Sequence, residues 1–147
     1  MNYFLVILTA TILTFAVACS AANDTSKTSE NDHMTAAASR TYAQNYKDMA
    51  LAYCIAKAYS DDPQANKDAT ATAGGLDQWT NYDAEDGATA IPDLVKKYLS
   101  RHYASIHGEK IKLDLLKCID MYHSKDLEKL VTKYVQKPNH SYMQDSK

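Results

Sequence analysis

The sequence lacks the short motifs that mark most catalytic and nucleotide-binding sites. It contains no HExxH, CxxC, CxxCH, GxGxxG or GxSxG pattern and no Walker loop. Its five histidines are scattered, and none is paired with another at metal-ligand spacing on one helical face. A Cys–His nucleophile made of Cys118 and His123 has no third residue to orient the histidine. A haem held by a methionine and a histidine on separate helices would be supported only by the presence of those residue types. We therefore expect no catalytic residues, no metal site and no cofactor.

Cysteine is also scarce, with three residues in 147. Cys19 ends an apolar stretch that begins at Tyr3 and is typical of a secretory signal, with small residues before the cysteine. A membrane span is a poorer interpretation, because it needs about 20 apolar residues and this stretch is shorter. A buried first helix is also poorer, because it would not explain the polar segment that follows. Because an exported chain meets an oxidising compartment, the remaining Cys54 and Cys118 are predicted to form one disulfide.

Two processing routes stay open at the N-terminus. Cleavage before Cys19, with a lipid added to that cysteine, gives a lipoprotein and is slightly favoured. Cleavage after Ala22 gives a soluble periplasmic protein and discards Cys19. The next residues are rich in Ser, Thr, Asn, Asp and Ala, which is typical of a flexible spacer. We expect a signal peptide at 1–18 (or to 22), a polar spacer at 19–38, a helical domain at 39–138 and a C-terminal tail at 139–147.

Phenylalanine is missing after the signal, since Phe4 and Phe15 both lie within it. The mature core must therefore be built from Tyr, Leu, Ile, Val, Ala, Met and the single Trp79. Ten of the eleven tyrosines belong to the mature chain. Tyrosine combines apolar area with a polar tip, so it suits half-buried helix faces and protein interfaces.

No segment alternates apolar and polar residues over a useful length, whereas apolar residues recur every three or four positions. This spacing predicts an all-α fold, a compact bundle of about five helices stapled by one disulfide. Asp62 with Pro63 and Ser124 are expected to begin two of the helices. Gly74-Gly75 is expected to interrupt the second helix, and loops are expected at 83–88 and 104–110. The clearest amphipathic stripe runs over 91–103, with Pro92 near its start.

Charge is unevenly distributed along the chain. Between Asp61 and Asp93 eight acidic residues face one lysine, a balance of −7, whereas from Leu94 to Lys147 eleven basic residues face six acidic ones, a balance of +5. An ordinary solvated surface would account for this pattern. The functional interpretation is an acidic surface that attracts a basic protein partner. Nucleic acid is not expected as a partner, because the basic half has no arginine-rich cluster.

The stretch Leu115-Leu116-Lys117-Cys118-Ile119-Asp120-Met121-Tyr122-His123-Ser124 resembles the immunity proteins that neutralise type VI secretion system amidase effectors. Other matching pieces are Tyr53-Cys54-Ile55-Ala56, Trp79 with Tyr82, Ile91-Pro92-Asp93-Leu94-Val95 with Tyr98-Leu99, and Ser124-Lys125-Asp126-Leu127. The resemblance covers about residues 42–138.

The resemblance implies a small, all-helical, exported, non-enzymatic protein that pairs as a homodimer. Its partner would be a cognate secreted amidase of the papain-like cysteine type, which cuts peptidoglycan at the D-glutamyl–diaminopimelate bond. A lipid anchor to a membrane would depart from the simple soluble form. Two alternatives remain: a periplasmic inhibitor of another cell-wall hydrolase, and a non-enzymatic helical adaptor lipoprotein.

A protein that blocks an enzyme cleft needs a projecting element, and two predicted loops qualify. The acidic loop carries Asp83, Glu85 and Asp86 and is expected to govern the rate of association. The second loop is less charged and better suited to burial in a cleft. Its expected partner-binding residues are Ser105, Ile106, His107, Gly108 and Glu109. Gly87 and Gly108 are expected to permit tight turns in the two loops.

Overall fold

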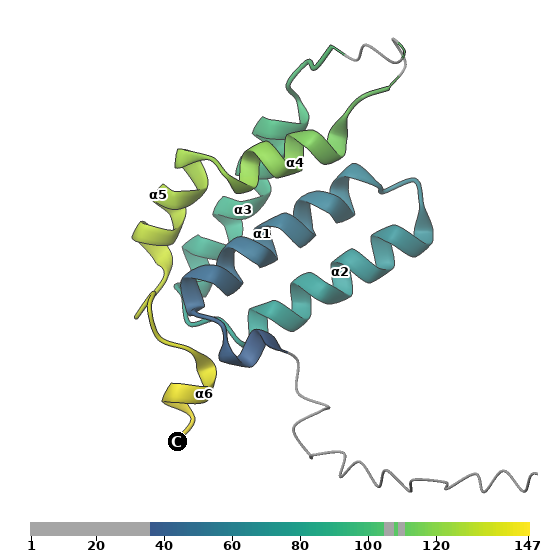
Figure 1. Ribbon diagram of the computed structural model, residues 1–147. Coiled ribbons are helices and arrows are strands. Elements are labelled where there is room, and N and C mark those ends of the chain that lie inside the picture. The colour runs from purple at the N-terminus through teal and green to yellow at the C-terminus, as the bar shows by residue number, and fades with distance from the viewer. Residues whose placement is uncertain (1–35, 105–107, 109–110) are drawn as a thin grey trace, which may run out of the picture. The chain divides into compact units, whose positions relative to one another are not determined.

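The computed structural model describes residues 36–104, 108 and 111–147 (Figure 1). These residues form a short 3₁₀ helix and six α-helices, and within them no strand occurs beyond two isolated bridges. The elements are η2 (Ala36–Ser39), α1 (Tyr42–Ala58), α2 (Pro63–Gln78), α3 (Ala84–Leu99), α4 (Asp114–Tyr122), α5 (Lys125–Tyr134) and α6 (Tyr142–Asp145). The all-α prediction is confirmed, and α6 is a short helix beyond the expected five.

Several helix starts follow from local capping chemistry. The Thr41 hydroxyl accepts a hydrogen bond from the Gln44 amide at 3.2 Å, and the Ser124 hydroxyl accepts one from the Leu127 amide at 3.1 Å. Asp62 caps α2, and Pro63 occupies the first helical turn, where its missing N–H costs nothing. These caps confirm the predicted starts at Asp62 and Ser124.

Two boundaries differ from expectation. The helix expected over 91–103 begins seven residues earlier, at Ala84, so Pro92 lies inside α3 and not near its start. Likewise, α2 runs through Gly74-Gly75 without a break. Each helical glycine costs about 1 kcal/mol relative to alanine, but packing of α2 along α1 outweighs this local preference.

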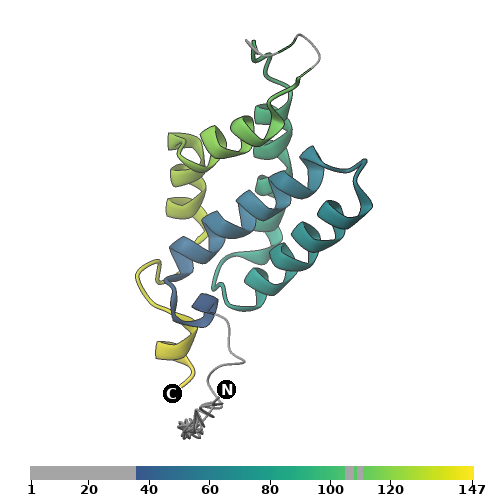
Figure 2. The same cartoon turned by 45° about the vertical axis from the view of Figure 1, so that its right-hand side comes forward.

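The helix α1 is the centre of the fold. It contacts α2, α3, α4 and α5, and Figures 1 and 2 show it crossing between α2 and the other helices. Because neighbours cover several of its sides, its buried residues do not form a single stripe. The core around α1 includes Tyr46, Met49 and Ala50 of α1, Val95 and Tyr98 of α3, Met121 of α4, and Leu127 and Val131 of α5.

A disulfide joins α1 to α4. Cys54 and Cys118 are linked, with their Cα atoms 5.7 Å apart, and both are fully buried. The predicted bridge is therefore confirmed. It fixes the middle of α4 against the central helix α1.

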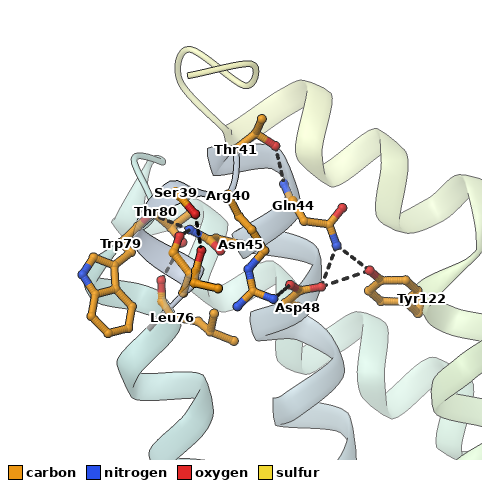
Figure 3. Close-up of polar contacts among 12 residues, drawn as sticks. Ser39, Arg40, Thr41, Gln44, Asn45, Asp48, Leu76, Trp79, Thr80 and Tyr122 are labelled. Carbon is orange, nitrogen blue, oxygen red and sulfur yellow. Dashed lines mark hydrogen bonds and ion pairs between the residues drawn. The ribbon is translucent and has the colours of Figure 1, made fainter. Parts of the chain in front are cut away.

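The ordered helical unit extends beyond 39–138 at both ends. Ala37 and Ala38 of η2 are buried, and the buried Asn45 donates to the carbonyls of Ala37 at 2.8 Å and Trp79 at 2.9 Å (Figure 3). At the other end, the Tyr42 amide donates to the His140 carbonyl at 2.7 Å. Residues expected in the spacer and the tail thus pack on α1.

Candidate partner-binding surface

The acidic residues expected in a loop lie at the start of α3. The Asp83 carboxylate accepts hydrogen bonds from the amides of Glu85 at 3.1 Å and Asp86 at 3.2 Å, so it is the N-cap of the helix. The prediction of a loop at 83–88 is wrong, because an Asp in this position satisfies two amides that would otherwise lack partners. Glu85 and Asp86 are exposed in the first turn, where the helix dipole favours negative charge.

Gly87 is needed for packing and not for a turn. It lies buried inside α3, where a Cβ atom would be 2.9 Å from Cδ2 of Tyr82 and 3.1 Å from Cβ of Tyr134. Its carbonyl accepts a hydrogen bond from the Tyr46 hydroxyl at 2.7 Å. The absent side chain therefore lets the acidic end of α3 approach three tyrosines, which fix its position.

Burial controls the chemistry of the tyrosines beside this helix start. Desolvation raises the pKa of the Tyr46 hydroxyl well above its usual value. The pKa of Tyr82 is raised in the same way, with a further contribution from its hydrogen bond to the Asp77 carboxylate. Both hydroxyls therefore stay protonated even in mildly alkaline solution, and they donate hydrogen bonds to the Gly87 carbonyl and to the Asp77 carboxylate.

The second predicted loop falls mostly outside the described residues. Ser105, Ile106, His107 and Glu109 are not among them. Gly108 is exposed and has a φ of 153°, a backbone conformation that residues other than glycine rarely adopt. Its carbonyl accepts a hydrogen bond from the Ile111 backbone amide at 3.2 Å.

The flanks of residues 104–110 are tied to each other. Lys117 of α4 is 5% exposed and donates to the Leu99 carbonyl of α3 at 3.2 Å and to the Asp114 carboxylate at 2.8 Å. The Tyr103 hydroxyl donates to the Asp120 carboxylate of α4. The C-terminal end of α3 and the N-terminal half of α4 are thereby held together beside the disulfide.

Sequence reasoning missed an exposed apolar face on α4. Leu115, Leu116 and Ile119 are 44%, 43% and 41% exposed, and nearby Ile111 is 47% exposed. Leu115, Leu116 and Ile119 belong to the same apolar run as Cys118 and Met121, which are buried. The sequence did indicate a second apolar face, because the apolar residues of this short helix extend around more of its circumference than the one side that packs on the core.

Polar residues between α1 and α4 are used for packing. The side-chain amide of Gln44 donates to the Asp48 carboxylate at 2.8 Å and to the Tyr122 hydroxyl at 2.6 Å. The Tyr122 hydroxyl in turn donates to the Asp48 carboxylate at 3.0 Å (Figure 3). Arg40 adds an ion pair with Asp48 at 3.1 Å. This network holds Tyr122 against α1, one turn beyond the disulfide.

Among residues 36–104, 108 and 111–147, no group of three or more His, Cys, Asp and Glu side chains could hold a metal ion. None of the helices in that same part of the chain is both long and apolar enough to cross a membrane. What the described residues do present is an acidic helix start, an exposed apolar helix face and an anchored pair of flanks around 104–110.

Comparison with known proteins identifies the family. The family model Tai4, described as a type VI secretion system (T6SS) amidase immunity protein, matches residues 44–131. No curated protein matches the chain.

Two solved structures are similar to the chain. One comes from work on new type VI-secreted toxins and self-resistance proteins in Serratia marcescens: it is 31% identical, with a TM-score of 0.67, over 74% of this chain and 86% of the other. The second belongs to the effector–immunity system Tae4/Tai4 from Salmonella typhimurium: it is 26% identical, with a TM-score of 0.63, over 71% of this chain and 99% of the other. The chain therefore belongs to the Tai4 family of type VI secretion system amidase immunity proteins.

Proposed function

We propose that this protein binds a cognate Tae4-type amidase in the periplasm and blocks its attack on peptidoglycan. The observation that carries the proposal is the family match over residues 44–131, which includes all of α2, α3 and α4 and most of α1 and α5. The protein acts by binding and performs no chemistry of its own. Consistent with this, the thiols of Cys54 and Cys118 are consumed in the disulfide, so neither is a nucleophile.

Two parts of the chain supply the contact with the amidase. Glu85 and Asp86, exposed on the first turn of α3, attract a basic surface and speed the encounter. Residues 105–109 enter the cleft of the enzyme. The ties from Lys117 to Leu99 and from Tyr103 to Asp120 support this role, because a contact segment with fixed ends loses less entropy on binding.

The protein works on the periplasmic side of the inner membrane. A secretory signal at 1–18 or 1–22 directs export, and a buried disulfide in the mature domain suits an oxidising compartment. Where cleavage leaves Cys19 as the first residue, a lipid on it anchors the protein, and the polar segment after it gives the domain reach to meet an incoming amidase.

The protein also forms a homodimer. The exposed apolar side chains of Leu115, Leu116 and Ile119 favour this, since contiguous apolar surface on one helix is costly to keep in water. A second copy would cover it in a symmetric contact.

The test is inhibition of peptidoglycan hydrolysis by the amidase of the source strain. Wild-type protein should abolish hydrolysis at equimolar concentration. Replacing residues 105–109 with a short Gly-Ser segment should speed dissociation and abolish inhibition. The double variant Glu85→Gln and Asp86→Asn should slow association several-fold at low salt, with the difference shrinking as salt rises. Asp83 is left unchanged, because its loss would also weaken the helix start.

The matched control carries the same charge change elsewhere. Asp61→Asn with Asp68→Asn neutralises two exposed carboxylates in the same acidic segment, but near the α1–α2 turn, and should leave association nearly unchanged. If wild-type protein leaves hydrolysis untouched, the function is wrong. If inhibition survives in both contact variants, the function stands and the proposed contact residues are wrong.

A further inference from the structure

A groove lies between α2 and α3, and α1 forms its floor. Both helices pack on α1, and the space left between them holds about 340 Å³. Met49 and Tyr53 of α1 line the bottom, and the walls come from Ala73, Gly74 and Asp77 of α2 and Ala88 and Ile91 of α3. We call this space the α2–α3 groove.

Small residues keep the α2–α3 groove open. Ala73, Gly74 and Ala88 present almost no side chain where α2 and α3 face one another. A Cβ atom added at Gly74 would meet nothing within 4 Å, which shows that this wall borders empty space and not packed atoms. Glycine at this position destabilises α2 by about 1 kcal/mol relative to alanine. No close packing of another group against Gly74 offsets this loss.

The groove continues along α3 and changes charge as it does so. A second space of about 370 Å³ shares Tyr53 and Pro92 with the first and ends beside Lys57 and Lys96. The opposite end carries the exposed Asp77, whose carboxylate accepts from the Tyr82 hydroxyl. An apolar floor thus joins an acidic end to a basic end.

We propose that the α2–α3 groove is a second docking surface for the amidase, separate from residues 105–109. It receives an apolar segment of the amidase that carries a basic residue near Asp77 and an acidic residue near Lys57 and Lys96. Charge complementarity at two ends fixes the direction of that segment, and the apolar floor supplies most of the buried area. The proposal depends on the proposed function, because it takes the amidase as the partner.

Filling the groove tests the proposal without harming the fold. Gly74→Leu places a side chain in the groove, whereas Gly74→Ala improves the helix equally well but leaves the groove open. Gly75→Leu is the control for size: a Cβ there would lie 3.9 Å from Trp79, and Gly75 lines a space with Ala71, Thr72 and Leu76 on another side of α2. All three variants of the exported chain should keep wild-type helicity by circular dichroism.

Affinity for the source-strain amidase, measured by biolayer interferometry, should fall at least tenfold for Gly74→Leu and stay at the wild-type level for Gly74→Ala and Gly75→Leu. Reversing the charge at either end, with Asp77→Lys or Lys96→Glu, should weaken binding by a smaller factor. Asp77→Asn, which keeps an acceptor for Tyr82, should weaken it less than Asp77→Lys.

The outcomes separate this proposal from the function on which it depends. If the wild-type chain does not bind the amidase, both are overturned. If the wild type and Gly74→Leu bind equally tightly, the groove proposal is overturned while the function stands. Sedimentation of each variant completes the test: a Gly74→Leu change in self-association with unchanged amidase affinity assigns the groove to a second copy, which also overturns the proposal.

Discussion

Single residues in this protein have roles that depend on their neighbours more than on their type. Gly74 and Gly87 both lie inside α-helices, where glycine is locally unfavourable. Gly87 is required because Tyr82 and Tyr134 occupy the space a side chain would need, whereas Gly74 faces open space. The same residue type is therefore a packing requirement in α3 and a groove-forming residue in α2.

This contrast gives a prediction for two alanine substitutions. Gly87→Ala should lower the free energy of unfolding by about 1–3 kcal/mol, because its Cβ would collide with Tyr82 at 2.9 Å. Gly74→Ala should raise it by about 0.5–1 kcal/mol, since the helix gains and nothing is displaced. Urea unfolding followed by circular dichroism measures both. Equal effects of the two substitutions would contradict the structural distinction.

At the scale of elements, α1 organises the molecule through two kinds of link. Covalent and apolar links join it to α4 through the disulfide and to α3 through the core around Val95 and Tyr98. Polar links join it to η2 and α6, which are held by hydrogen bonds of Asn45 and Tyr42. The covalent and apolar links should contribute most of the free energy of unfolding. The polar links to α6 should depend on pH, because they include the Asp145 carboxylate.

The disulfide should make the larger contribution. It closes a loop with a sequence separation of 64 residues, which corresponds to about 4 kcal/mol of unfolded-state entropy in the chain-entropy model. The double variant Cys54→Ala and Cys118→Ala should lose about that free energy of unfolding and melt at a markedly lower temperature. Wild-type protein treated with reductant should behave like the variant, and free thiols at both positions in exported protein would contradict the bridge.

The docking of α6 should weaken in acid. The Asp145 carboxylate contacts His140 at 2.9 Å and Lys137 at 3.1 Å, and the hydrogen bond from His140, followed by the one from Lys137, lowers its pKa below the usual 3.8. Because the folded pKa is the lower one, its stabilisation is present above about pH 3.8 and is lost as the pH falls through the folded pKa.

Amide hydrogen exchange in α6 measures this. Protection of the Ser146 amide, which donates to the Tyr142 carbonyl at 2.9 Å, should fall as the pH is lowered, after correction for the intrinsic exchange rate. Asp145→Asn should show the weaker protection already at neutral pH and little further change in acid. Unchanged protection in this variant would show that Asp145 does not hold α6.

At the scale of the whole molecule, an immunity protein must be folded and present where the amidase arrives. The charge separation extends over several helices, and the apolar face of α4 stays exposed because no other described helix covers it. Anchoring and self-association are therefore tested on the full chain.

The anchor prediction concerns Cys19. If this residue carries a lipid, Cys19→Ser should move the protein from the membrane fraction to the soluble periplasm, while its inhibition of the amidase in solution should be unchanged. Immunoblotting of cell fractions measures the shift. Soluble wild-type protein that begins at residue 23 would refute the lipid anchor and leave export intact.

The dimer prediction concerns α4. Leu116→Glu places a charge on the exposed apolar face and should convert a dimer into a monomer in sedimentation experiments. Met143→Glu is the matched control, since Met143 is equally exposed at 43% but lies on α6, and it should remain dimeric. A monomeric wild type would contradict the dimer prediction.

The sequence by itself determined the helical class, the bridge between Cys54 and Cys118, and the helix starts at Asp62 and Ser124. The helical class and the helix starts depend on the spacing of apolar residues and on contacts within a few positions, which a linear pattern records. The bridge spans 64 positions and was predicted instead from the expected export and from the two cysteines that remain after Cys19. The family resemblance was equally accessible, because it lay in the segments around the two cysteines.

Only the tertiary structure decided where α3 begins and what surrounds its start. Asp83 and Gly87 are locally typical of a loop. Asp83 is instead the N-cap of α3, and Gly87 packs inside that helix against Tyr46 and Tyr134, which are distant in sequence, and against nearby Tyr82. The α2–α3 groove and the exposed face of α4 also required it. Whether an apolar or small residue is buried depends on which other helix lies opposite, and that is fixed by packing of the whole chain on α1.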